Sequence, residues 1–169
     1  MIILLHIVLC LGTVVAQATV SSWLTINSMY PDLCLVLACL AGFLTNEYKG
    51  LLIGLTVGLF QDLLSPGGIG LNMILKGLAG SLAGATTHTI STVTVPAVVM
   101  VTLVLSLVCG LASLVMAYPA LDGAETFHAI SRILAPQALY QSVLAAGIFW
   151  LTHKIRQSLS VVHFAQGRR

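Results

Sequence analysis

Apolar runs long enough to cross a bilayer follow one another along most of this chain, and residues 1–20 form the first of them. A helix needs about 20 apolar residues to cross a hydrocarbon core of roughly 30 Å. Only 7% of the residues are charged, whereas a soluble domain usually carries about 25%. The pattern predicts an integral membrane protein that lies in the lipid bilayer as a single domain.

These runs do not alternate between apolar and polar residues, so we expect an all-α polytopic membrane protein rather than a barrel. We expect about six spans, at residues 1–20, 31–45, 50–64, 71–87, 96–117 and 133–153. The third is short, and we expect it to begin near Glu47 or to cross a locally thinned bilayer. Residues 118–132 are expected to form the longest loop. The chain would then divide into a six-helix transmembrane domain at 1–153 and a short basic tail at 154–169.

Basic residues orient these spans. Four Lys and Arg residues lie in the tail, namely Lys154, Arg156, Arg168 and Arg169. Such residues accumulate on the cytoplasmic side of a membrane, so six spans place both termini in the cytoplasm of a cell with an inner membrane. Ala16-Gln17-Ala18 is similar to a signal-peptide cleavage site, but no Lys or Arg precedes the apolar run. We expect the first span to be retained, with its cleavage as the alternative.

The stretch at 50–84 is rich in glycine at helical spacing. Five glycines recur at four-residue intervals in two groups, Gly50, Gly54 and Gly58, then Gly80 and Gly84. Small residues at this spacing let two helices in a membrane approach closely. The segment Ser65-Pro66-Gly67-Gly68 between the groups cannot easily continue a helix. We therefore expect a tight helical hairpin, whose glycines pack either within this chain or against a helix of another protein.

Four polar residues lie near the turn of this hairpin: Gln61, Asp62, Asn72 and Lys76. An ionisable group stranded in lipid costs several kcal/mol, so Asp62 and Lys76 need partners. Hairpin partners at these positions differ in depth by roughly 4.5 Å, which a lysine side chain can cover. We expect either a structural ion pair, or groups that reach the headgroups, or a partner- or ligand-binding site that opens outward. Gln137 and Gln141, one turn apart, could face the same cavity.

A second carboxylate, Asp32, follows Pro31 at the start of the expected second span. Proline is tolerated in a first helical turn, and a carboxylate there meets the positive end of the helix dipole. We therefore interpret Asp32 as a residue that stabilises the start of its own helix.

Signatures of catalysis are missing from the sequence. It contains no HExxH, no Gly-x-Ser-x-Gly and no phosphate loop, and its four cysteines show no CxxC spacing. The segment Gly67-Gly68-Ile69-Gly70-Leu71-Asn72 is similar to a stretch of lipoprotein signal peptidases, but no aspartate follows Asn72 closely. We expect no enzymatic activity, no metal and no cofactor. The net charge of +2 does not favour nucleic-acid binding.

The segment from Pro31 to Gly84 resembles the rod-shape-determining protein MreD family. The shared residues are Pro31-Asp32, then Gly54-x-x-x-Gly58-Leu59-x-x-Asp62-Leu63-Leu64-Ser65, then Gly70-Leu71-Asn72, with small residues at Gly80 and Gly84. The length of the chain and its basic C-terminal tail are also typical of that family.

The resemblance implies a non-enzymatic inner-membrane subunit of the bacterial elongation machinery. Such a subunit would bind the single-span scaffold MreC and thereby support the MreB cytoskeleton and the peptidoglycan synthases. We expect the small-residue surface of the 50–84 hairpin to dock the scaffold helix, so that bulk at Gly58 would prevent docking. The family is similar in fold to the substrate-capture subunits of energy-coupling-factor transporters. The alternative is therefore a vitamin-capture subunit whose outward polar cluster holds the ligand.

Overall fold

The computed structural model describes residues 10–17, 19, 31–65, 70–89, 93–119 and 122–166. Every secondary-structure element among them is a helix, which confirms the all-α prediction. After a first helical segment at 10–17 come α2 (Leu33–Leu44), α3 (Glu47–Leu64), α4 (Leu71–Thr89), α5 (Val95–Ala117), α6 (Gly123–Ala129), the π-helix η1 (Ile130–Leu134) and α7 (Ala135–Gln166). The remainder of the expected first span, with its possible cleavage site, lies outside the described residues.

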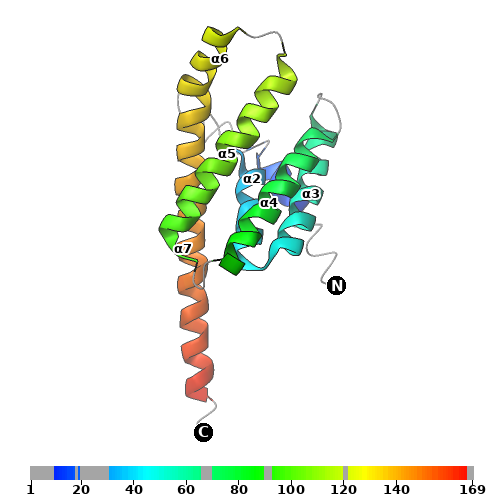
Figure 1. Cartoon of the computed structure of the whole chain (residues 1–169). Coiled ribbons are helices and arrows are strands. Elements are labelled where there is room, and N and C mark those ends of the chain that lie inside the picture. Colours follow the sequence, from blue (N-terminus) through cyan, green and yellow to red (C-terminus); the bar gives the residue numbers. More distant parts are fainter. Residues whose placement is uncertain are drawn as a thin grey trace.

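The helices form two groups that lie side by side (Figure 1). Helices α2, α3 and α4 pack on one another, and we call them the α2–α4 unit. Helix α5 packs along α7, and α2 contacts both helices of this α5–α7 pair. Figure 1 also shows that α6 and α7 follow each other as one long rod, which projects beyond the other helices at its C-terminal end.

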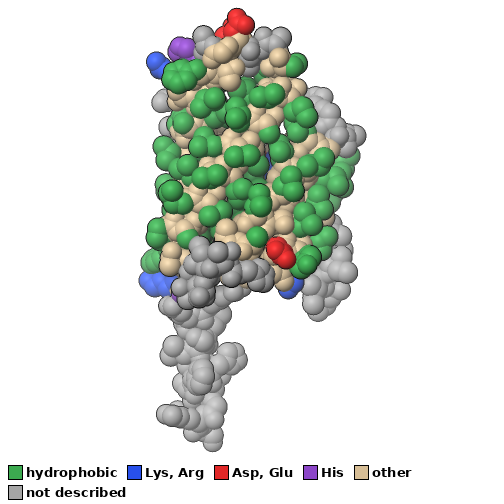
Figure 2. All heavy atoms as spheres, viewed as in Figure 1, with side chains coloured by type: hydrophobic (Ala, Val, Ile, Leu, Met, Phe, Trp, Pro, Cys, Tyr) green, Lys and Arg blue, Asp and Glu red, His purple; other side chains and the backbone are tan. Residues whose placement is uncertain are grey.

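Within the described parts of the chain, two helical stretches are long and apolar enough to cross a membrane, α5 at Val95–Ala117 and the rod at Glu125–Ile155. Helix α2 is also apolar but shorter. Figure 2 shows hydrophobic side chains spread over the middle of the molecule, with charged side chains gathered at its two ends. This distribution suits a protein embedded in a bilayer, because charges avoid the hydrocarbon core. The expected total of six membrane spans remains a prediction.

Glycines bring the backbones of the α2–α4 unit into direct contact. A Cβ atom at Gly50 would overlap the carbonyl oxygen of Gly80, and one at Gly54 would overlap that of Lys76. Gly58 lies equally close to the backbone of Asn72. The glycine surface is therefore filled by the chain itself. Our expectation that this surface stays exposed to dock a scaffold helix is wrong, because α3 and α4 cover each other's glycines.

Helix α3 begins at Glu47, the start that one of the two expectations for the third span requires. That this end lies in the headgroup region stays a prediction. The side chain of Asn46 accepts a hydrogen bond from the backbone N–H of Lys49 at 2.9 Å and so caps the helix. An N-cap of this kind satisfies a backbone donor that has no partner within the helix.

The predicted loop at 118–132 is mostly helical, because α6 begins at Gly123 and continues through η1 into α7. Asp122 stands at the N-cap position of α6 and Glu125 lies in its first turn, where acidic residues favour a helix. Pro136 does not end the rod. The backbone N–H of Ala135 bonds to the carbonyl of Ile130, and this wider turn makes room for the proline ring, which would clash with a regular helix.

The predicted boundary between a transmembrane domain and a polar tail at residue 154 is not a break in structure. Helix α7 runs through this point and ends at Gln166. The first part of the predicted basic tail, up to Gln166, is therefore helical and continues the rod, while the division into two regions stays a prediction.

A polar cavity between the two helix groups

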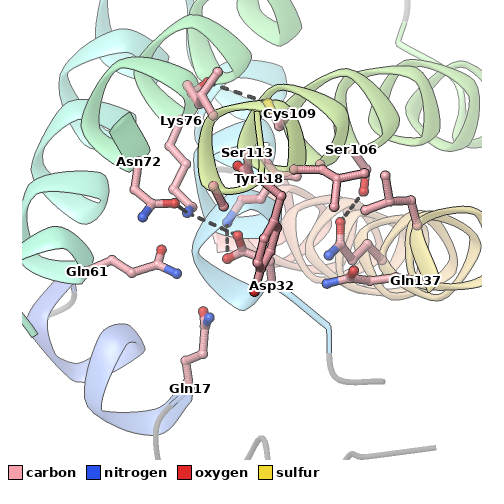
Figure 3. Close-up of a pocket in the computed structure, with 17 residues that line it drawn as sticks. Gln17, Asp32, Gln61, Asn72, Lys76, Ser106, Cys109, Ser113, Tyr118 and Gln137 are labelled. Atoms are coloured by element: carbon pink, nitrogen blue, oxygen red, sulfur yellow. Dashed lines mark hydrogen bonds and ion pairs between the residues drawn. The ribbon is translucent and has the colours of Figure 1, made fainter. Parts of the chain in front are cut away.

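A cavity of about 320 Å³ separates the α2–α4 unit from the α5–α7 pair. Its lining residues come from the first helical segment and from α2, α3, α4, α5, η1 and α7, and they mix amide, hydroxyl and charged groups with leucines (Figure 3). They are Gln17, Asp32, Leu35, Gln61, Asn72, Leu75, Lys76, Ser106, Cys109, Gly110, Ser113, Leu114, Ala117, Tyr118, Leu134, Gln137 and Gln141.

Helix ends explain where this cavity lies. It is bordered by Asp32 at the start of α2, by Gln61 in the last turn of α3 and by Asn72 in the first turn of α4. Tyr118, directly after α5, completes this end. In the orientation predicted from the basic residues, this end of the bundle faces outward.

Asp62 does not line the cavity but connects the end of α3 to the start of α4. Its carboxylate accepts hydrogen bonds from the backbone N–H groups of Gly70 (2.9 Å), Asn72 (3.2 Å) and Met73 (3.0 Å). A fourth bond, of 2.8 Å, comes from the side-chain amide of Asn72. The side chain is only 2% exposed. Asp62 therefore satisfies the free donors at the start of α4, where a negative charge is also favoured by the helix dipole.

Lys76 forms its ion pair with Asp32, at 3.0 Å between Nζ and Oδ2. The Lys76–Asp62 ion pair, one of the alternatives that the sequence leaves open, is therefore wrong. Lys76 also donates a 2.8 Å hydrogen bond to the side-chain carbonyl of Asn72, whose amide group in turn donates to Asp62. A continuous chain of polar contacts thus links α2, α4 and the end of α3, with Asn72 as its central member.

Asp32 has two roles in this arrangement. Its carboxylate accepts a 3.1 Å hydrogen bond from the backbone N–H of Leu35, which confirms the predicted stabilisation of the start of α2. The other carboxylate oxygen receives the ammonium group of Lys76. The Lys76 side chain is 3% exposed and that of Asp32 is 23% exposed, so the lysine depends on the aspartate more than the aspartate depends on the lysine.

The opposite wall of the cavity comes from α5 and α7. The hydroxyl of Ser106 donates to the side-chain carbonyl of Gln141, and both side chains are buried. Gln137 also borders the cavity, as its spacing from Gln141 suggested. Ser106, Gly110 and Ser113 form a small-residue face of α5 that borders the cavity.

The structure brings three of the four predicted site residues, Gln61, Asn72 and Lys76, to this cavity. Asp62 does not border the cavity but accepts a hydrogen bond from the side chain of Asn72, which does. Our sequence reasoning missed Asp32 as a cavity residue, although its position at the outward end of a span was a usable signal. It also missed Gln17 and Ser106, because nothing in their local sequence relates them to the 50–84 hairpin.

The unequal exposure of Asp32 and Lys76 predicts unequal effects of mutation. Asp32→Asn keeps a residue that caps helices well but leaves the buried ammonium group without its counter-charge, so we expect a loss of stability of about 3–5 kcal/mol. Lys76→Met leaves a carboxylate that still has access to water and still caps α2, so we expect a clearly smaller loss. Thermal unfolding of the two purified variants in detergent tests this order. Equal losses of stability would contradict the prediction that Lys76 depends on Asp32 more than Asp32 depends on Lys76.

The comparisons with known proteins address the whole chain. The sequence model of the rod shape-determining protein MreD family matches residues 1–155, which include every residue that lines the cavity. No curated protein and no solved structure shows significant similarity to the chain. The match covers most of the sequence and agrees with the resemblance noted at Pro31-Asp32 and along the hairpin. The chain therefore belongs to the rod shape-determining protein MreD family.

Proposed function

We propose that this chain is a non-enzymatic inner-membrane subunit of the elongation machinery and binds the transmembrane helix of an MreC-like scaffold. The match of residues 1–155 to the MreD family carries this proposal. Membership of the family implies a role in rod-shape determination, and the family is part of the MreBCD shape complex. Through the scaffold, the subunit would support the MreB cytoskeleton and the peptidoglycan synthases.

The outer face of α5 is the surface that we propose for the scaffold helix. Only 22% of the apolar stretch of α5 is buried against other parts of the chain, compared with 33% of the apolar stretch of the rod at Glu125–Ile155. Exposed apolar side chains follow one another at helical spacing along α5, at Met100, Val104, Val108, Leu111 and Val115. A transmembrane helix can pack along such a stripe through van der Waals contacts. The glycine contacts of the α2–α4 unit would keep the neighbouring surface rigid.

A matched pair of substitutions tests this surface. Val108 on α5 is 57% exposed and Leu78 on α4 is 54% exposed, so tryptophan at either position projects into lipid without disturbing the core. Val108→Trp is expected to reduce the amount of co-purified MreC-like scaffold roughly tenfold, which corresponds to about 1.4 kcal/mol. Leu78→Trp is expected to leave it unchanged. Normal co-purification with Val108→Trp would rule out docking on α5.

A further inference from the structure

We infer that the cavity is a binding site for a small uncharged molecule that carries a carboxamide on an apolar body. Its volume of about 320 Å³ lies within the range of small-molecule sites, which begins at about 300 Å³. This site is separate from the α5 surface proposed for the scaffold and does not depend on it.

The charges of the cavity favour an uncharged ligand. Among the described residues, Lys76 and Asp32 are the only charged ones that line it, and they neutralise each other at 3.0 Å. An anion close to Lys76 would also lie close to Asp32, and a cation close to Asp32 would meet Lys76. Since bringing an uncompensated charge into a poorly solvated site is costly, neither kind of ion gains from binding here.

Two polar atoms indicate what the ligand must offer. The side-chain carbonyl oxygen of Gln61 is buried and has no hydrogen-bond partner within the part of the chain that the structure describes. An ammonium group has three donors, and Lys76 directs two of them to Asp32 and Asn72. Figure 3 shows the amide of Gln61 and the ammonium group of Lys76 pointing into the same space. A carboxamide can donate to Gln61 and accept from Lys76 at once.

Leucines lie beside the polar groups in the lining of the cavity. Four leucines border the cavity, namely Leu35, Leu75, Leu114 and Leu134, and they can enclose the apolar body of a ligand. Tyr118, at the end of α5, lines the cavity and is 62% exposed, so we place the entrance for the ligand at this end of the bundle. Sites that combine apolar walls with a few polar groups are typical of small-molecule binding.

Benzamide, benzoate and benzamidine test the inference, because they share one ring and one size but are neutral, negative and positive. We expect the purified full-length chain in detergent to bind benzamide with a millimolar dissociation constant, which is appropriate for so small a probe. Binding of the two charged probes should be at least about tenfold weaker. Ligand-observed NMR titrations measure all three. Equal binding of the three probes, or no saturable binding of benzamide, would overturn the inference.

Substitutions locate the binding to the cavity. Gln61→Leu removes the unpaired acceptor and should weaken benzamide binding about tenfold, because the donor of the ligand loses its partner. Ser113→Leu fills part of the cavity and should weaken it independently. Thr56→Val, at an exposed position on the same helix as Gln61, is the matched control and should bind like the wild type. Unchanged binding in both cavity variants would place the probe elsewhere and refute the site.

Discussion

Gly54→Ala is expected to lower the free energy of unfolding by about 3 kcal/mol or more, although it adds a single methyl group. The new Cβ atom would overlap the carbonyl oxygen of Lys76 and lie 2.9 Å from the Cα atom of Gly77. Both contacts are with backbone, which cannot rotate away as a side chain can. Helices α3 and α4 must therefore separate along their contact, and other close glycine contacts of the hairpin are lost with it. The apparent melting temperature in detergent should fall by roughly 6–12 °C.

Gly147→Ala is the matched control. Gly147 also lies inside a helix, but nothing approaches the position of its Cβ atom within 4 Å. Alanine has a higher helix propensity than glycine by about 1 kcal/mol, so this variant should be neutral or slightly more stable. A similar melting temperature for both variants would show that the close packing of α3 on α4 does not determine stability.

Asp62→Ala is the second substitution with a large expected effect, a loss of about 3 kcal/mol. It removes an acceptor that serves four donors at a site only 2% exposed, and donors left without partners in a buried site are costly. Asp62→Asn keeps one carbonyl oxygen and should lose less, because asparagine also caps helices well. Thermal unfolding measures the losses, and faster hydrogen exchange is expected at the first turn of α4.

Asp122→Ala provides the control for the loss of a carboxylate at a helix start. Asp122 occupies the N-cap position of α6 but is exposed and makes no capping hydrogen bond through its side chain. Asp122→Ala should lower the melting temperature by less than Asp62→Ala does. A loss as large as that of Asp62→Ala would mean that charge near a helix start, rather than the four hydrogen bonds, explains the effect.

Local patterns were sufficient to predict several features of the chain. The glycine spacing at 50–84 predicted a close helical hairpin, and the structure places these glycines against the facing backbone. The pair Pro31-Asp32 predicted the start of a helix, and Asp32 caps α2. Such predictions succeed because a spacing of four residues, or a capping residue before an apolar run, refers only to one helix and its nearest neighbour.

Other features required contacts between segments distant in the sequence. Closeness along the hairpin makes Asp62 one possible partner for Lys76, but the partner in the structure is Asp32 at the start of a different helix. The polarity of residues 118–132 predicts a loop, whereas α6 and the π-helix before Pro136 make residues 123–134 helical. Polarity alone does not distinguish a loop from a helix end that reaches the membrane surface.

The sequence by itself thus determined that the chain is helical and apolar, where its hairpin turns, and which faces of its helices allow close approach. The tertiary structure decided which polar groups meet, and it assembled Gln17, Lys76 and Gln141 around one cavity from three separate parts of the chain. The physical reason is that spacing sets the direction of a side chain only relative to its own helix axis. The rotation of each helix against its neighbours depends on how all of their surfaces pack together.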